Sequence, residues 1–299
     1  MHRKTSLRAY IANKYIIYGF RRRTDEEFER ILRKRLLRGP RTYTAPLPYS
    51  LRNSFSVEKK YGYEIFYFNN KKPSGVTFFF LHGGAFTSEI TMFHCHSVSR
   101  LASWSHAKAI VPLYPLIPFA DHRTTIRFIE RLYLDYKKEH PDERIVFVGD
   151  SAGGGLALTM SEIFAKKNIA QPEKIITFSP WLDVSMSNPH IPEYEEQDVL
   201  LYPSALIFLG KKWAGPIDTK DYRVSPRFGD LSVLENVTFY VGTEEILFPD
   251  VVETYEIMKG LGKNCTLHVG EKLGHDYPIF PIPEGFEALK MCANEIAGQ

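Results

Sequence analysis

Cysteine is scarce in this chain, and long apolar runs are missing. The 299 residues include three cysteines, an odd and sparse set that predicts free thiols in a reducing compartment rather than a disulfide framework. No stretch approaches the roughly 20 apolar residues that a membrane-spanning helix needs. The basic start lacks both the uninterrupted apolar segment and the small-residue cleavage site of a secretory signal. We therefore expect a cytoplasmic protein without stable membrane insertion.

A pattern of metal ligands is also missing. His94-Cys95-His96 brings suitable side chains together, but neighbours at i and i+2 point apart on the helix expected there. We expect neither a metal nor another cofactor.

Acidic residues are few at the start of the chain. Residues 1–41 hold 13 Lys and Arg against 4 Asp and Glu, a net charge of +9, so the rest of the chain carries −6. We interpret this segment as a solvated, basic helical layer. The alternative is that it associates with anionic lipid or with an acidic substrate. Nucleic acid is not expected as a partner, because no recognised binding module accompanies the charge.

What the chain does have is a regular alternation of strand and helix patterns, which predicts an α/β fold with a mostly parallel sheet covered on both faces. Strands are expected near 55–60, 63–68, 76–81, 109–114, 144–148, 174–178, 237–241 and 265–269, the first two as an antiparallel hairpin at the sheet edge. Two segments interrupt the rhythm. We expect residues 1–45 and 187–222 to form a helical cap, and residues 46–186 and 223–299 to form the two parts of the core.

Ser151 lies in Gly149-Asp150-Ser151-Ala152-Gly153, between a β-branched apolar strand and a helical pattern. A serine on a strand-to-helix turn, with glycines two positions before and after it, is typical of the nucleophile of α/β-hydrolases. A glycine-rich turn at a helix start can equally hold a phosphate. Other motifs in the chain are therefore needed to distinguish a nucleophile from a phosphate site.

Acyl transfer also needs donors for the oxyanion. The sequence His82-Gly83-Gly84-Ala85 follows the expected strand 76–81. We expect backbone N–H groups of Gly83 and Gly84, with that of Ala152 and with Ala85 as a further candidate, to converge on one oxygen. His82 precedes these donors, and we expect it to structure the loop.

We expect the general base and the acid that orients it in the turns that follow the last two strands. His275 follows the strand 265–269 and completes the chain order serine, acid, histidine. Its rivals lie on expected helices or at their ends (His94, His96, His106, His122 and His140) or in the 187–222 segment (His190). After the strand 237–241 come Glu244 and Glu245, and either carboxylate fits the chemistry of holding an imidazole.

Several motifs, taken in order, resemble the hormone-sensitive-lipase-like esterases of the α/β-hydrolase superfamily. They are His82-Gly83-Gly84-Ala85, Tyr114-Pro115-Leu116-Ile117-Pro118, Gly149-Asp150-Ser151-Ala152-Gly153-Gly154, Ser179-Pro180-Trp181-Leu182-Asp183, Tyr222-Arg223-Val224-Ser225-Pro226 and Gly274-His275. The resemblance implies an α/β-hydrolase fold, a Ser-Asp/Glu-His triad and a helical cap.

Two departures from the family pattern concern the site. Ungapped alignment with the family pattern puts Glu245 on the acid position. Ala85 replaces the third glycine of the oxyanion loop, which should be tolerated if its φ stays negative.

The function predicted is that of a serine carboxylic-ester hydrolase acting on small-molecule esters with acyl groups of about eight carbons or fewer. Amide or peptide hydrolysis by the same triad is an alternative. A non-catalytic binding protein on this fold is disfavoured, because His275 is present. The oligomeric state stays open, with a homodimer as one candidate.

Overall fold

The structure is a computed structural model that describes residues 6, 24–39, 55–69 and 74–299. Within these ranges no helix has the length and apolar character that crossing a membrane requires. Of the predicted cap segment 1–45, residues 24–39 are described, and the remainder, apart from Ser6, lies outside the described residues.

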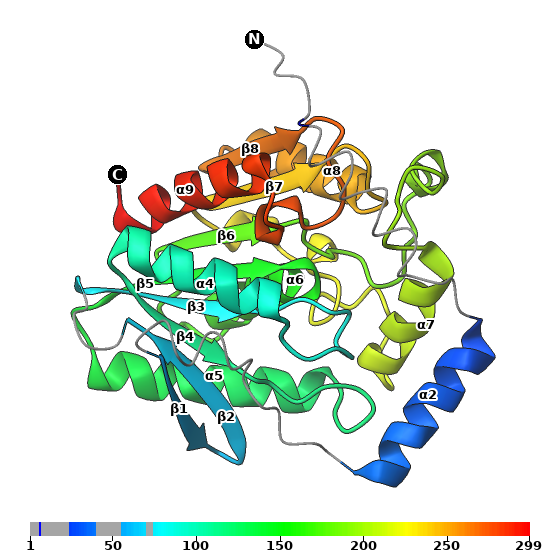
Figure 1. The fold of residues 1–299 in the computed structure, drawn as a ribbon, viewed down its shortest axis with the longest axis horizontal. Coiled ribbons are helices and arrows are strands. Elements are labelled where there is room, and N and C mark those ends of the chain that lie inside the picture. The colour runs from blue at the N-terminus through cyan, green and yellow to red at the C-terminus, as the bar shows by residue number, and fades with distance from the viewer. Residues whose placement is uncertain (1–5, 7–23, 40–54, 70–73) are drawn as a thin grey trace.

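The described residues form an eight-stranded sheet with helices on both faces (Figure 1). Its spatial order is β1-β2-β4-β3-β5-β6-β7-β8. The strands are β1 (Phe55–Lys60), β2 (Tyr63–Phe68), β3 (Val76–Leu81), β4 (Lys108–Pro112), β5 (Arg144–Asp150), β6 (Lys174–Phe178), β7 (Val237–Gly242) and β8 (Cys265–Gly270). The pairs β1–β2 and β2–β4 are antiparallel and the others are parallel. The edge hairpin and the mostly parallel sheet agree with the prediction from the sequence.

Helices cover both faces because alternate strand residues point to opposite sides. In β3, Phe79 and Leu81 join one buried cluster, whereas Phe78 and Phe80 join another. The first cluster includes residues of α5 (His122–Glu139), α6 (Ser151–Lys166) and α8 (Phe248–Gly260). The second includes residues of α4 (Met92–Ser105) and α9 (Pro283–Ala297), which lie together on the near face in Figure 1.

One strand is shorter than its pattern predicts. We expect a strand over 109–114, but β4 ends at Pro112. Proline has no N–H to donate to a neighbouring strand, so the ladder stops there.

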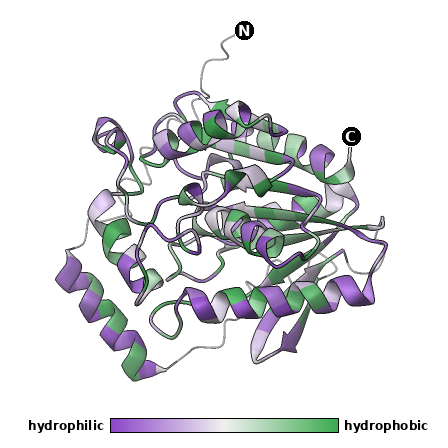
Figure 2. Ribbon diagram, turned by 180° about the vertical axis from the view of Figure 1, so that it is seen from behind, coloured by the Kyte–Doolittle hydropathy of each residue, from purple (hydrophilic) through white to green (hydrophobic). Residues whose placement is uncertain are grey.

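Two helices outside the strand–helix alternation pack against each other. They are α2 (Asp25–Arg38) and α7 (Pro203–Ala214), the latter inside the 187–222 segment. The ring centroids of Phe28 and Phe208 are 5.7 Å apart, and Lys212 Nζ lies 2.5 Å from Glu29 Oε1. Thr24 starts α2 with a capping box, and hydrophilic and hydrophobic residues alternate along this helix in Figure 2.

The carboxyl ends of β3, β5, β7 and β8 point to the same side of the parallel sheet, since these strands run in one direction. Open α/β sheets bind ligands at this edge. The turns that follow these four strands carry all of the predicted site residues.

Candidate active site

Ser151 is the first residue of α6 and lies on a sharp turn directly after β5. Its φ of 49° is in the left-handed region, which costs a non-glycine residue roughly 1–2 kcal/mol. The turn depends on close backbone approach. A Cβ added at Gly149 would lie 2.5 Å from the carbonyl oxygen of Gly153, and one added at Gly153 would lie 1.9 Å from that of Leu81. The glycines therefore let strand and helix pass close enough to hold the serine in this conformation.

Three predicted residues come together at this edge. Nε2 of His275 lies 3.0 Å from Ser151 Oγ, and Nδ1 of His275 lies 2.7 Å from Glu245 Oε2. All three side chains are buried, with exposed fractions of 5% for His275, 7% for Ser151 and 0% for Glu245. The contacts form one continuous chain from hydroxyl to imidazole to carboxylate.

Glu245, rather than Glu244, contacts the imidazole. Its other oxygen, Oε1, accepts hydrogen bonds from Ser179 Oγ at 2.6 Å and from the N–H of Gly242 at 2.8 Å. Glu244 is half-buried, and its backbone N–H bonds to Leu273. Because three donors hold the Glu245 carboxylate, its position is fixed without help from solvent.

The support from Ser179 is a feature that the sequence reasoning missed. The signal was available, because Ser179 begins the Ser-Pro-Trp segment directly after β6, but no role was assigned to its hydroxyl.

A second carboxylate lies beside the imidazole and was also missed. Asp276 Oδ2 is 3.1 Å from Nε2 of His275, the nitrogen that faces Ser151. Burial by itself would lower the pKa of His275, but the carboxylates of Asp276 and Glu245 outweigh it and hold that pKa well above its ordinary value. The site therefore favours the positively charged form of the imidazole.

Two of the predicted oxyanion donors, Gly83 and Ala152, lie next to Ser151. A Cβ added at Gly83 would lie 2.9 Å from Ser151 Cβ, so the backbone of Gly83 passes directly beside the serine. Among the hydrogen bonds of the described residues, none is donated by the N–H of Gly83 or Gly84. Ala152 is in the first turn of α6, where helix N–H groups have no acceptor within the helix. The N–H groups of Gly83 and Gly84 therefore have no protein acceptor among the described residues.

The loop conformation contradicts one expectation. Ala85 does not keep a negative φ: its φ is 49°, and that of Phe86 is 56°. The two consecutive left-handed residues turn the Phe86 ring onto Trp213 of α7, with centroids 3.7 Å apart and an interplanar angle of 4°. Packing against α7 thus accompanies a conformation that alanine disfavours.

His82 structures the loop, as expected. It is fully buried, its ring stacks on Tyr114 with centroids 4.4 Å apart, and its Nδ1 lies 2.8 Å from the carbonyl oxygen of Gly83. Burial, reinforced by nearby His94, lowers the pKa of His82 to about 4. A neutral, enclosed imidazole of this kind holds the loop and is not available as a base.

The residue before the serine has a partner on α4. Asp150 Oδ2 lies 2.9 Å from His94 Nε2, and the N–H of Thr91 donates to His94 Nδ1 at 3.0 Å. This buried contact joins the nucleophile turn to the start of α4.

The 187–222 segment is joined to the acid-bearing turn. Asp198 Oδ2 accepts a hydrogen bond at 2.9 Å from the N–H of Ile246, next to Glu245. Its Oδ1 accepts from the N–H groups of Leu200 and Leu201. A movement of this segment would therefore displace the turn that carries Glu245.

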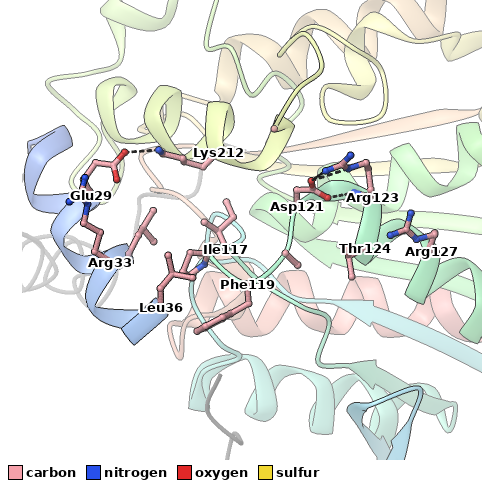
Figure 3. Close-up of a pocket in the computed structure, with 14 residues that line it drawn as sticks. Glu29, Arg33, Leu36, Ile117, Phe119, Asp121, Arg123, Thr124, Arg127 and Lys212 are labelled. Atoms are coloured by element: carbon pink, nitrogen blue, oxygen red, sulfur yellow. Dashed lines mark hydrogen bonds and ion pairs between the residues drawn. The ribbon is translucent and has the colours of Figure 1, made fainter. Parts of the chain in front are cut away.

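On the other side, α2 reaches the oxyanion loop. Arg35 Nη1 donates to the carbonyl oxygen of Thr87 at 2.5 Å. A groove of about 510 Å³ lies between α2, the 117–121 loop, α5 and α7 (Figure 3). Figure 3 shows two ion pairs in its lining, Glu29 with Lys212 and Asp121 with Arg123.

Comparison with known proteins gives the class. A family described as alpha/beta hydrolase fold matches residues 78–279, and the chain belongs to this family. An acetyl-hydrolase of Streptomyces hygroscopicus is 23% identical over 74% of this chain and 75% of its own length. An esterase of Acinetobacter venetianus is 33% identical over 58% of this chain and 57% of its own length.

Solved structures agree. A predicted esterase from Staphylococcus aureus superposes with a TM-score of 0.88 at 26% identity, covering 92% of this chain and 94% of its own. An esterase from the bacterial hormone-sensitive lipase family superposes with a TM-score of 0.82 at 20% identity over 99% of each chain, which shows a shared fold. The resemblance found in the motifs is confirmed, and these relatives support an ester hydrolase on this fold.

Proposed function

We propose that this protein is a serine carboxylic-ester hydrolase in which Ser151 is the nucleophile, His275 the general base and acid, and Glu245 the residue that orients the imidazole. The observation that carries the proposal is the continuous contact from Ser151 Oγ through both nitrogens of His275 to Glu245, at 3.0 and 2.7 Å. This arrangement is the one that acyl transfer needs.

The reaction follows from the positions of these groups. Ser151 Oγ attacks the ester carbonyl carbon while its proton passes to Nε2 of His275. The carbonyl oxygen becomes an oxyanion that the N–H groups of Gly83, Gly84 and Ala152 stabilise, each donor contributing roughly 2.7–4 kcal/mol. The ester C–O bond breaks as Nε2 returns the proton to the departing alcohol. Water, deprotonated by the same imidazole, then hydrolyses the acyl-serine and releases the carboxylic acid.

The preferred acyl group is short to medium, of about eight carbons or fewer. Three buried aromatic residues support this preference: Phe86 on the oxyanion loop stacks on both Trp213 and Trp181, and the N–H of Trp181 bonds to the carbonyl oxygen of Ser151. Further methylenes add roughly 0.8 kcal/mol each only when a pocket can bury them, and we propose that these aromatic rings limit the acyl pocket.

We propose that residues 24–39 and the 187–222 segment belong to a cap over this site. The contacts of α2 with α7, and those of Arg35 with Thr87, support this assignment, because they join both segments to each other and to the oxyanion loop.

We infer that the protein resides in a reducing compartment such as the cytoplasm. Three free, buried thiols at Cys95, Cys265 and Cys292 support this inference. Recovery of the protein in a membrane or secreted fraction after cell fractionation would contradict it.

The function is tested with p-nitrophenyl esters from acetyl to palmitoyl, assayed with the wild type and with Ser151→Ala and His275→Ala. We expect activity to be highest at or below about eight carbons, and both variants to lose nearly all of it, because triad members act as a unit. More than a few per cent of activity in either folded variant would refute the assignment of the triad. Activity that rises through palmitoyl esters would refute the preference for short chains.

A further inference from the structure

Asp276 places a carboxylate on the imidazole nitrogen that faces the nucleophile. Nε2 of His275 lies 3.0 Å from Ser151 Oγ and 3.1 Å from Asp276 Oδ2. Asp276 is 6% exposed, and its N–H donates to Ser179 Oγ at 3.0 Å. Its φ of 56° is left-handed, a conformation that Asp, Asn and Gly tolerate best. The carboxylate is thus held in place by the backbone, with little access to water.

This arrangement has a chemical consequence. With Nδ1–H donated to Glu245, a neutral His275 presents a lone pair at Nε2, and a lone pair forms no hydrogen bond with an ionised carboxylate. A contact of 3.1 Å between Nε2 and Asp276 Oδ2 therefore requires a proton between them. Oδ1 of Asp276 is buried and has no hydrogen-bond partner within the described residues, so no other group there holds this side chain.

The surrounding charges keep that proton in place. Burial raises the pKa of Asp276; nearby His275 opposes this rise, while Asp150 and Glu245 add to it. The charged and titratable groups around the pair come from the sheet edge, α4 and the cap segment. They are Asp150, His94, Asp198, Glu245 and, next in the chain, Tyr277.

We propose that Asp276 is a positioning residue that shares a proton with Nε2 of His275 in the resting enzyme, so that Ser151 is activated only after this proton has left. The proposal rests on the triad described above. At low pH the shared proton is present and Nε2 cannot accept the proton of Ser151, so activity appears as pH rises. Removing the negative charge of Asp276 removes one of the two carboxylates that favour the protonated imidazole, so activity should appear at lower pH.

Two substitutions test this proposal, Asp276→Asn and Asp276→Gly. Both residues accept the left-handed backbone, and both keep the N–H that bonds to Ser179. Glu162→Gln is the matched control, since Glu162 is a buried carboxyl on α6 that accepts from the N–H of Asp230, away from the imidazole. The rate at which a fluorophosphonate labels Ser151, and kcat/KM for a short p-nitrophenyl ester, are measured from pH 4 to 10.

We expect the acidic midpoint of both profiles to fall by about one pH unit or more in each Asp276 variant, the size of effect that a charge within hydrogen-bonding distance has on an imidazole. One unit below the wild-type midpoint, a variant would then show about half of its plateau rate, roughly five times the wild-type fraction. Glu162→Gln should keep the wild-type midpoint.

The outcomes separate the two proposals. If Ser151 is labelled in the folded Asp276 variants but the pH midpoint of labelling is unchanged or raised, the shared proton is refuted and Ser151 is still the nucleophile. The same conclusion follows if the plateau rate falls while the pH midpoint is unchanged. If the pH midpoint of labelling falls but the protein does not hydrolyse esters, the result supports the shared proton and contradicts the proposed substrate class. Failure of a fluorophosphonate to label Ser151 at any pH overturns both.

Discussion

Replacing Gly83 with alanine should disable the oxyanion hole with little effect on the fold. The backbone of Gly83 is not left-handed, so alanine is acceptable for its φ, and the obstacle is space alone. The added Cβ would lie 2.3 Å from Asp150 Oδ2, 2.9 Å from Ser151 Cβ and 3.0 Å from the carbonyl oxygen of Asp150. Ordinary carbon contacts are about 3.5–4.0 Å, so the loop must retreat from the serine by roughly an ångström.

A retreat of this size removes the N–H of Gly83 from the oxyanion. Loss of one such donor costs a factor of about 10²–10³ in kcat, and we expect Gly83→Ala to lose at least that much with a smaller change in KM. The assay is the initial rate on a short-chain p-nitrophenyl ester, with circular dichroism and thermal unfolding to verify the fold.

Gly260→Ala supplies the matched control. Gly260 ends α8, and a Cβ there would meet no heavy atom within 4 Å. This variant should keep its kcat and gain about 0.5–1 kcal/mol in the free energy of unfolding. A folded Gly83→Ala protein with kcat within about twofold of the wild type would refute our placement of the oxyanion hole.

Three further substitutions test the acid and the loop. Glu245→Gln should lower kcat by about 10³–10⁴-fold, because an amide cannot hold the imidazole in the required tautomer. Glu244→Gln should change kcat only a few-fold, and the reverse order in folded proteins would show that the acid is misassigned. Ala85→Gly should raise the free energy of unfolding by about 1 kcal/mol, since glycine adopts a φ of 49° without the cost to alanine. A fall in thermal midpoint would contradict this account of the strain.

Features that depend on local pattern were predictable from the sequence. The strands and helices of the core follow from apolar periodicity, and the parallel direction of β5, β7 and β8 places their carboxyl ends at the same edge of the sheet. The serine turn, the loop after β3 and the histidine loop could then be assigned to one edge. The choice of Glu245 over Glu244 came from alignment with a family pattern, because both residues have the same chemistry.

Features that depend on contacts between distant segments were not predictable. The left-handed φ of Ala85 accompanies the packing of Phe86 on Trp213, which is more than a hundred residues away in the sequence. The residues next to Ala85 therefore do not predict this φ. The pairing of His94 with Asp150 needs the position of α4 relative to the sheet. The contact of Asp276 with His275 accompanies a left-handed φ at Asp276, which the sequence of the loop does not specify.

The packing of α2 on α7 has a consequence for the synthesis of the chain. Glu29 and Lys212 are 183 residues apart, so α2 leaves the ribosome long before its partner exists. At 5–20 residues per second, the interval is on the order of 10–40 seconds. During that time Phe28 lacks Phe208, the α7 ring on which it stacks in the folded chain. A newly made chain therefore passes through a period in which the Phe28 face of α2 is not yet covered by α7 and is accessible to chaperones.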